Sequence, residues 1–356
     1  MFKCILFLVA GIILLLIIAG VSLIAFLTLK EYRPEEIITL EASQYPVEQL
    51  HTGETVRILT WNTGYCGLDQ SQDFFMDGGS GVQPSPPQVV TDNLIGIQES
   101  LQTINSDLIL LQEVDTDSKR SYHQNQQEQY ETALSDYAST FAYNFKVAYI
   151  PYPLPPIGEV NSGIMTLSRY QMADCERVAL PTSFSWPVRI AQLKRCLLVS
   201  RLPLKDSGRE LVLVNLHLEA YDDGSGKIAQ TTALIELLEQ EYEKGNYVIA
   251  GGDFNQVFSS VDSQRYMIKN SDLWTPGTID LNDFSAGWQF AVDDKIPTCR
   301  LLNEPYDPDS INTQHYVIDG FILSPNVTLE QVENIDLGFR NSDHNPVCLQ
   351  VTFPES

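Results

Sequence analysis

Hydrophobic residues are concentrated at the N-terminus, where residues 4–29 carry no charge and consist mostly of Ile, Leu, Val, Phe and Ala. About 20 such residues are enough to cross a bilayer as a helix. A cleaved signal peptide normally has an apolar core of roughly 7–15 residues followed by a small-x-small cleavage site. Here the run is longer and leads straight into TLKEYRPEE. The pattern favours an uncleaved, single-pass membrane anchor over residues 1–29 rather than a cleaved signal peptide.

The basic residues that flank this run are nearly balanced. Lys3 precedes it, and Lys30 and Arg33 follow it. The positive-inside rule depends on an excess of Lys and Arg on one side, so both orientations stay open. Of the two, we expect the orientation that places the rest of the chain outside the cytoplasm.

After a predicted tether over residues 30–54, strand-like and helix-like patterns alternate across a predicted domain at 55–356. From Val89 to Ile104 apolar residues recur at helical spacing, and the DLILLQEVD that follows is typical of a buried strand. A second such pair is KIAQTTALIELLEQEYEKG, a predicted helix with Gly245 as its C-cap, followed by YVIAGGDFN. Other predicted strands are VRILTWNTG, LVLVNLHLEA and HYVIDGFIL. This alternation indicates an α/β fold.

Three segments do not fit these patterns. Residues 65–89 are rich in Gly and Pro and predict a loop of about 25 residues, a length usually linked to function or disorder. YIPYPLPPIG at 149–158 and FSWP at 184–187 combine aromatic residues with proline. These two segments either form the rim of a pocket or approach lipid headgroups, or they only pack against neighbouring loops. The sequence leaves both interpretations open.

Composition narrows the class of protein. The 356 residues are 44% hydrophobic and 10% aromatic, which excludes a disordered acidic chain. There are 46 acidic residues against 22 basic ones, so the net charge is −24, and it is −25 once residues 1–29 are set aside. Binding to duplex nucleic acid normally depends on Lys and Arg that displace counterions from phosphates. Nucleic acid is therefore a less favoured partner.

The six cysteines show no CxxC pair and no metal-ligand spacing. Cys4 lies in the apolar run, so the domain retains five cysteines, an odd number that implies no complete disulfide framework. Buried thiols are the simplest interpretation. The redox compartment and the oligomeric state stay open.

Polar residues stand at or just beyond the ends of the apolar strands, where ligand sites of α/β proteins collect. Taken singly, each has an ordinary structural explanation, such as a turn residue or a packed core histidine. Together they supply carboxylates, amides and imidazoles, which suit a hard cation such as Mg²⁺ and the hydrolysis of a phosphate ester. These residues are Asn62, Glu113, His217, Asp253, Asn255, Asp343 and His344.

The ordered set of motifs resembles the endonuclease/exonuclease/phosphatase superfamily, the DNase I-like fold. The similarity extends from about Val56 to Thr352. It implies a four-layer α/β/β/α sandwich of two mixed β-sheets, here preceded by one transmembrane helix, with divalent-cation-dependent hydrolysis of phosphomonoesters or phosphodiesters. The motifs that carry it are LTWNTG, LLQEVD, NSGIMTLSR, LVNLHLEA, IAGGDFNQ, VIDGFILS and NSDHNPV.

The resemblance also implies a metal site and a contact to substrate. Glu113 is expected to be the principal ligand of Mg²⁺, with Asn62 and Asp343 completing or supporting the site. Mn²⁺ or another divalent cation is an alternative, and one or two ions fit the family. Asn161 in the NSG motif is expected to touch the phosphate.

The remaining roles implied by the resemblance concern proton transfer and charge. Asp253 and Asn255 are expected to orient the attacking water and the scissile phosphate. Asp319 is expected to hold the ring of His344 in its working tautomer. His344 then contacts the phosphate or transfers a proton, and His217 stabilises charge or protonates the leaving oxygen.

Within the superfamily the sequence looks nearest to a membrane-anchored bacterial branch that resembles sphingomyelinases and GPI-anchor lipid remodelling proteins. We therefore expect a membrane-anchored hydrolase that acts on a lipid headgroup or another small phosphodiester. Two alternatives remain, an exported or surface nuclease and a non-catalytic sandwich module.

Overall fold

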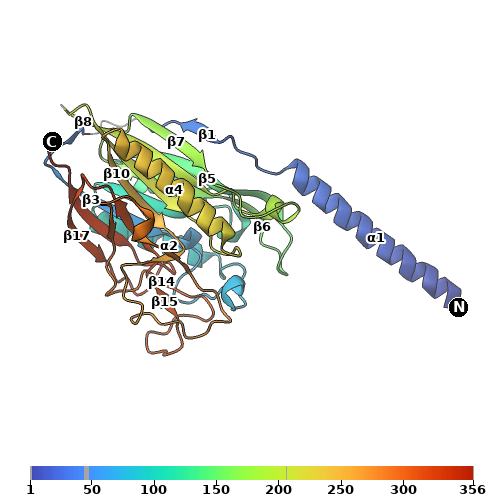
Figure 1. Ribbon diagram of the computed structural model, residues 1–356. Helices are drawn as coiled ribbons and strands as arrows, with labels where there is room; N and C mark the ends of the chain where they lie inside the picture. The colour runs from blue at the N-terminus through green and yellow to red at the C-terminus, as the bar shows by residue number, and fades with distance from the viewer. Residues whose placement is uncertain (1, 44–47, 206, 356) are drawn as a thin grey trace.

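The computed structural model describes the chain except for residues 1, 44–47, 206 and 356. Two mixed β-sheets face each other, as Figure 1 shows. In the larger sheet the strand order is β1-β7-β8-β9-β10-β16-β13, and β2 pairs with β8 outside this order. Its strands are β1 (Ile37–Leu40), β2 (Leu50–His51), β7 (Asp174–Ala179), β8 (Cys196–Lys205), β9 (Glu210–His217), β10 (Tyr247–Asp253), β13 (Gln289–Ala291) and β16 (Asp319–Leu323).

The second sheet has the order β17-β18-β3-β4-β6-β5. Its strands are β3 (Thr55–Asn62), β4 (Leu108–Asp115), β5 (Ala138–Ile150), β6 (Gly158–Ser168), β17 (Thr328–Asn334) and β18 (Val347–Thr352). Two short pairs lie outside the main sheets, β11 (Gln256–Phe258) with β12 (Gly277–Ile279) and β14 (Cys299–Arg300) with β15 (His315–Tyr316).

The strands are apolar on both faces because each sheet is covered on both sides. In β3, Ile58 points into the core between the sheets, whereas Leu59 points outward toward α2 (Gln88–Ile104). In the larger sheet, Ile249 faces the inner core, and Val248 faces the outer core that contains residues of α4 (Ser225–Glu243). A strand alternates its side chains with a period of two, so two-sided burial gives a continuous apolar run. The predicted four-layer α/β/β/α sandwich is confirmed.

The helices follow their predicted apolar faces. All five residues of the α2 pattern are buried, namely Val90, Leu94, Ile97, Leu101 and Ile104. Helix α4 buries Leu234 and Leu238 against the larger sheet. It ends at Glu243, and Gly245 adopts a left-handed conformation with φ +89°, which glycine adopts without steric penalty. The remaining helices of the domain are α3 (Gln126–Ala133) and the 3₁₀ turns η1 (Gly64–Cys66), η2 (Phe75–Asp77), η3 (Lys119–Ser121), η4 (Val188–Ala191) and η5 (Leu281–Asp283).

The segment predicted as a tether is partly built into the sandwich. Residues Ile37–Leu40 form β1, which pairs antiparallel with β7, and Leu50–His51 form β2, which pairs parallel with β8. Strands of four and two residues are too short to give a readable alternation, which is why the sequence pattern did not reveal them.

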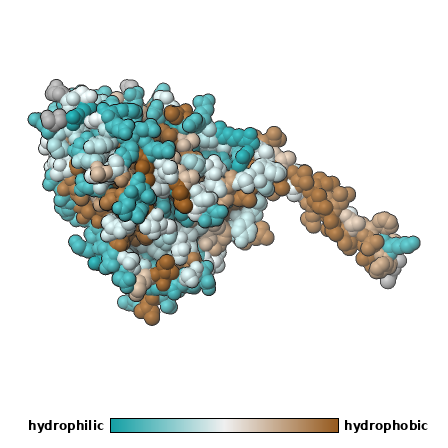
Figure 2. Space-filling model, in the orientation of Figure 1, coloured by the Kyte–Doolittle hydropathy of each residue, from teal (hydrophilic) through white to brown (hydrophobic). Residues whose placement is uncertain are grey.

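The N-terminal helix α1 (Phe2–Leu29) projects from one end of the sandwich and is apolar along most of its length (Figures 1 and 2). It is long and apolar enough to cross a membrane, although a signal sequence would meet the same criterion. Its last turn contacts the domain, where Leu27 is only 5% exposed. It also contacts β5 and η4.

Candidate active site

Pairing between strands brings the predicted residues of the larger sheet into one row. Strands β9 and β10 are parallel, and their last residues, His217 and Asp253, lie side by side. Strand β16 runs antiparallel to β10, so its first residue, Asp319, pairs with Asp253 from the other side. The second sheet contributes Asn62 from the end of β3 and Glu113 from β4. The two sheets therefore present their polar strand ends to each other.

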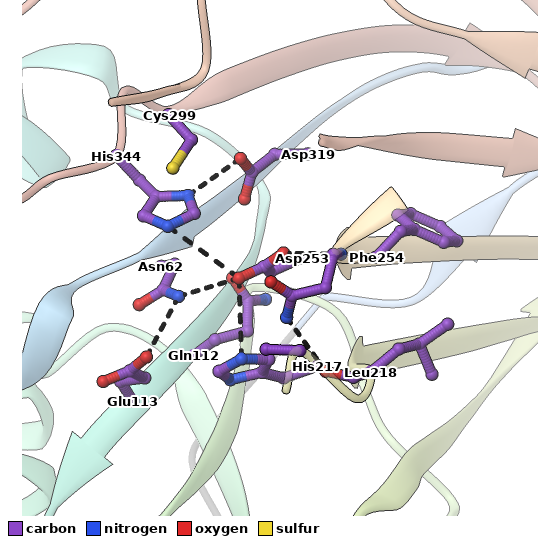
Figure 3. Close-up of polar contacts among 12 residues, drawn as sticks. Asn62, Gln112, Glu113, His217, Leu218, Asp253, Phe254, Cys299, Asp319 and His344 are labelled. Carbon is purple, nitrogen blue, oxygen red and sulfur yellow. Dashed lines mark hydrogen bonds and ion pairs between the residues drawn. The ribbon is translucent and has the colours of Figure 1, made fainter. Parts of the chain in front are cut away.

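One carboxylate oxygen, Oδ2 of Asp253, is the centre of the polar contacts (Figure 3). It accepts a hydrogen bond of 3.0 Å from Nδ2 of Asn62. It also lies 3.5 Å from Nε2 of His217 and 3.8 Å from Nε2 of His344. Burial, followed by the nearby charge of Asp319, raises the pKa of Asp253 from its ordinary value of 3.8 to about 6. Asp253 therefore holds its proton to a higher pH than an exposed aspartate does.

The two histidines that flank this oxygen differ in electrostatic environment. His344 lies in the loop before β18, and its Nδ1 is 2.8 Å from Oδ2 of Asp319, as predicted. Burial opposes a charged ring, but the carboxylate of Asp319 and the hydrogen bond outweigh it and raise the pKa of His344 well above its usual value. Burial, followed by the positive charges of Arg195 and His344, lowers the pKa of His217 well below its usual value. One imidazole is thus favoured in its charged form and the other in its neutral form.

Glu113 reaches the site through a strained and irregular part of β4. Its φ is +56°, a left-handed conformation that is uncommon for residues other than glycine. The pairing of β4 with β6 shifts register between Leu111 and Val114, and such a bulge redirects the side chains within it. The carboxylate accepts a hydrogen bond of 3.3 Å from Asn62 and lies 3.9 Å from Arg120. Strained backbone of this kind is often retained at functional sites.

The predicted metal ligands suit a hard cation. Asn62, Glu113 and Asp343 all line one pocket, and Glu113 and Asp343 offer carboxylate oxygens. Asn62 instead turns its Nδ2 toward Glu113 and Asp253, and its Oδ1 accepts a hydrogen bond of 3.0 Å from the backbone N–H of Gly64, so the placement of its oxygen does not support the predicted role as a ligand. Burial, together with the charge of Glu113, raises the pKa of Asp343 from 3.8 to about 7, although His344 and Arg300 oppose this. Adjacent, desolvated carboxylates repel each other, and a bound cation would offset that repulsion. The donor set therefore fits Mg²⁺ or a similar divalent ion.

A second group of possible ligands overlaps the first site. One ligand-type atom from each of Asp253, Asp319 and His344 lies within 4.8 Å of the others. In this group the Nδ1 of His344 is already bonded to Asp319. A hydrogen-bonded pair accounts for that arrangement without an ion, so we favour the oxygen set around Glu113 as the cation site.

Asn255 and Asn161 differ in how far the structure supports their predicted roles. Asn255 has φ +50°, and its Nδ2 donates to the backbone oxygen of Leu218 at 2.9 Å, which fixes the amide at the pocket wall. Asn161 instead donates to the backbone oxygen of Asp117 at 2.7 Å and to Glu159 at 3.1 Å, and it does not line the pocket. Its neighbour Ser162 does line the pocket. The placement gives no support for a contact between Asn161 and substrate.

Two arginines at the pocket were missed by sequence reasoning. Arg120 follows β4 in turn η3 and stacks over the ring of Tyr65, with 3.9 Å between the guanidinium carbon and the ring centroid. Arg195 precedes β8 and donates to the backbone oxygen of His217 at 3.2 Å. Its Nε is buried and has no hydrogen-bond partner among the residues that the structure describes. Both lie in connections without a motif, so no sequence signal identified them.

An amide pair beneath the site joins the two sheets. Gln112 of β4 donates to Asn215 of β9 at 2.8 Å, and Asn215 donates to the backbone oxygens of Leu111 and Met165. All of these groups are buried. Buried, satisfied networks fix geometry, so this bridge holds the polar ends of the two sheets in register.

The site lies in a pocket of about 530 Å³. The predicted residues that line it are Asn62, Glu113, His217, Asp253, Asn255, Asp343 and His344. Asp319 does not line this pocket, and it contacts the site through its hydrogen bond to His344.

Comparison with known proteins agrees with this architecture. The model of the endonuclease/exonuclease/phosphatase family matches residues 59–344. The chain belongs to this family. Enzymes of this family hydrolyse phosphate esters and typically use divalent metals. Membership in the family therefore supports a hydrolase. No curated protein has significant sequence similarity to the chain.

Solved structures share the DNase I-like fold at low identity. An endonuclease/exonuclease/phosphatase from Beutenbergia cavernae is 16% identical, with 84% of this chain and 72% of that chain covered and a TM-score of 0.57. A family protein from Leptotrichia buccalis is 14% identical, covering 84% and 100% of the two chains, with a TM-score of 0.53. TDP2 from D. rerio, solved with a single-strand DNA product, is 16% identical, covering 84% and 99%, with a TM-score of 0.51. These matches establish the fold and do not separate the branches of the family.

Proposed function

We propose that this protein is a divalent-cation-dependent phosphoester hydrolase, held on a membrane by α1, that acts on a lipid headgroup or another small phosphodiester. The observation that carries the proposal is the position of Asp253 Oδ2 between His217, His344 and Asn62, in the same pocket as Glu113. A carboxyl group, two imidazoles and a set of cation ligands supply what hydrolysis of a phosphate ester requires.

The proton path follows from the geometry. Asp253, oriented by Asn62 and by the backbone N–H of Asn255 at 2.9 Å, accepts a proton from the water whose oxygen forms the new bond to phosphorus. His344, held protonated by Asp319, donates hydrogen bonds to the negative charge that builds on the phosphoryl oxygens. As the bond from phosphorus to the leaving oxygen breaks, His344, the imidazole favoured in its charged form, supplies that oxygen with a proton, and the proton taken up by Asp253, whose Oδ2 lies 3.8 Å from Nε2 of His344, restores the imidazolium.

The carboxylates of Glu113 and Asp343 would hold a divalent cation, with Asn62 supporting Glu113 through its Nδ2. Such a cation would supply Lewis-acid stabilisation of negative charge at the phosphate. Arg120 lies near enough to Glu113 to orient that carboxylate and to add positive charge at the pocket wall. The residues of this chain therefore position substrate and proton, and the ion neutralises charge.

The membrane and the net charge favour a lipid or small diester over nucleic acid. With residues 1–29 set aside the chain carries −25, so a polyanion meets long-range repulsion. A nuclease is the second candidate function, because D. rerio TDP2, which shares the fold, was solved with a DNA product. Degradation of single-stranded DNA or RNA by the purified protein at physiological salt would favour that candidate.

The test is a phosphate-release screen with the full-length protein in lipid nanodiscs. Lipids, nucleic acids and sugar phosphates are assayed with Mg²⁺, with Mn²⁺ and with EDTA. Turnover is expected only with a divalent cation. Glu113→Gln is expected to lower it by a factor of 10² or more, whereas Glu236→Gln, an exposed matched control on α4, leaves it unchanged. Equal rates in EDTA would refute the proposal.

A further inference from the structure

The pocket that contains the polar site has a second, apolar half. Alongside the site residues, its walls include side chains from α1, from η2, from the loop between β5 and β6, and from η4. The apolar lining of this half includes Leu23, Ile24, Leu27, Met76, Tyr152 and Val188. A pocket built only to bind a small polar phosphate needs no such wall, and apolar lining is what binds hydrocarbon.

The end of α1 is clamped to the domain beside this wall. Trp186 donates through Nε1 to the hydroxyl of Thr28 at 3.2 Å. Just after the helix, Glu31 forms ion pairs with Arg189 at 3.2 Å and Lys194 at 3.3 Å, and its side chain is only 2% exposed. These contacts hold the last turns of α1, which line the apolar half of the pocket, against the domain.

The depth of this half of the pocket can be placed relative to a bilayer. A helix of 28 residues is about 42 Å long, against about 30 Å for the hydrocarbon core and 40–45 Å with the headgroup regions. When α1 spans the bilayer, its final turns therefore lie in the headgroup region. Leu23 is six residues, or about 9 Å, below Leu29. The apolar half of the pocket thus opens at the level of the headgroups and the first carbons of the lipid chains.

The rim around the opening is exposed and apolar. Tyr152 and Leu154 in the loop between β5 and β6 are 67% and 88% exposed, and Trp186 and Val188 beside η4 are 53% and 52% exposed. Tyr and Trp favour the membrane interface, where their rings meet both hydrocarbon and water. The brown surface of α1 in Figure 2 leads into this end of the domain.

Charges of both signs lie at the same junction. Lys30 and Arg33 follow α1 directly, but Arg33 is paired with Glu31 at 2.8 Å, and Glu35 and Glu36 come next in the sequence. Lys146 on β5 lies 6.0 Å from the ring of Tyr32. Lysine and arginine close to a membrane surface are attracted to anionic headgroups. The feature that favours a lipid surface as the partner of this end of the domain is therefore the exposed apolar and aromatic rim, to which the cations at this junction add little because most of them pair with Glu31.

We propose that this rim rests on the bilayer that α1 crosses, and that the apolar half of the pocket takes the hydrocarbon part of a phosphate ester that is still embedded in that bilayer. The phosphate then lies at Asp253 and His344 while the chain extends toward Leu23 and Leu27. The inference rests on the proposed function and adds to it the class of substrate, an amphiphilic phosphate ester of the membrane.

The first test varies the chain length of soluble substrates. Methyl, ethyl, propyl and butyl 4-nitrophenyl phosphodiesters are assayed with the full-length protein in nanodiscs. We expect kcat/KM to rise by up to about fourfold for each methylene that becomes buried. Val188→Asn is expected to flatten this dependence, and Ile228→Asn, an apolar residue 69% exposed on α4, to leave it unchanged.

The outcomes separate the two proposals. Turnover of the methyl ester without any dependence on chain length overturns the inference and leaves the proposed hydrolase intact. No turnover of any ester with any divalent cation overturns the proposed function, and the substrate class falls with it.

The second test does not depend on activity. In nanodiscs made with dibrominated lipid chains, Trp186 is expected to be quenched by the bromine atoms. Trp186→Phe should remove most of this quenching, and Trp288→Phe, at a residue 4% exposed in the core, should retain it. Quenching that persists in Trp186→Phe, or that is absent from the unmodified protein, would show that the rim does not touch the bilayer.

Discussion

Replacing Asp253 by asparagine separates the part this residue plays in chemistry from its effect on stability. The carboxyl group is 2% exposed, and its pKa is raised from 3.8 to about 6. A raised pKa means that the folded state holds the proton more tightly than the unfolded chain does. The stability from this group is present below pH 3.8 and is lost as the pH rises through about 6. Asparagine keeps the shape and does not titrate.

The magnitude follows from the pKa. The rise in the pKa of Asp253 from 3.8 to about 6 corresponds to a cost of about 3 kcal/mol in the free energy of folding when the carboxylate is ionised, because each pKa unit is about 1.4 kcal/mol. We expect Asp253→Asn in EDTA to be more stable than the unmodified protein by on the order of 2 kcal/mol at pH 7.5, and by much less at pH 4.5. At the same time kcat should fall by a factor of about 10²–10⁴, the usual contribution of a general base.

The assay pairs urea unfolding at the two pH values with turnover of a soluble phosphodiester in Mg²⁺. Asp283→Asn, at an exposed position on η5, is the matched control and should change neither quantity. EDTA is needed in the unfolding experiment because a bound cation would itself favour the ionised carboxylate. If the gain in stability of Asp253→Asn over the unmodified protein is no larger at pH 7.5 than at pH 4.5, the carboxylate is not desolvated as described. If it keeps full activity, Asp253 does not take the proton.

Three further predictions test other parts of the molecule. Asp319→Asn should lower kcat by one to two orders of magnitude. Because the pKa of His344 falls when the Asp319 carboxylate is removed, the alkaline loss of activity should also move to lower pH. An unchanged pH profile would show that Asp319 does not act through His344. Although burial opposes ionisation, hydrogen bonds led by that from Arg201 lower the pKa of Glu241 from 4.5 to about 2, so Glu241→Gln should reduce the free energy of unfolding by about 2 kcal/mol at pH 7. That difference should shrink as the pH falls below 4.5, and a constant difference in urea titrations would contradict it. Deleting residues 1–29 should abolish turnover of phosphate esters in vesicles while turnover of the methyl 4-nitrophenyl diester, which does not need the apolar wall that α1 forms, remains. Equal loss on both would point to a folding defect, which circular dichroism would reveal.

The convergence of the site residues could be predicted because strand ends are readable in the sequence. Asn62, His217 and Asp253 each end an apolar run, and parallel pairing of neighbouring strands necessarily brings such ends to one edge. The bond between Asp319 and His344, which are 25 residues apart, followed from the family resemblance and is present at 2.8 Å.

Other site features could not be predicted because they depend on tertiary packing. Arg120 reaches the site through a 3₁₀ turn whose position follows from its ion pair with Asp115, and nothing local marks it. The bulge that redirects Glu113 is a property of how two strands pair, not of either strand alone. Asn161 belongs to a recognisable motif, yet its amide is occupied by Asp117.

The fold was predictable to the level of its layers. Apolar runs and two amphipathic helices predicted an α/β fold, the family resemblance implied the four-layer sandwich, and the structure agrees with both. The shortest strands, β1 and β2, carry too few residues to be recognised and were assigned to a tether. The sequence did not predict that α1 forms part of the pocket wall, because this depends on how the end of the helix packs against the domain.

The clamp that Glu31 forms with Arg189 and Lys194 has a kinetic consequence. A domain joined to its anchor by a loose linker tumbles freely and samples the water above the bilayer. A domain clamped to its anchor turns only as fast as the bilayer lets the helix turn, and it searches in two dimensions. Its rate should then follow the number of substrate molecules per unit area of membrane rather than their concentration in the sample, so diluting the substrate with inert lipid should slow the enzyme while adding buffer should not.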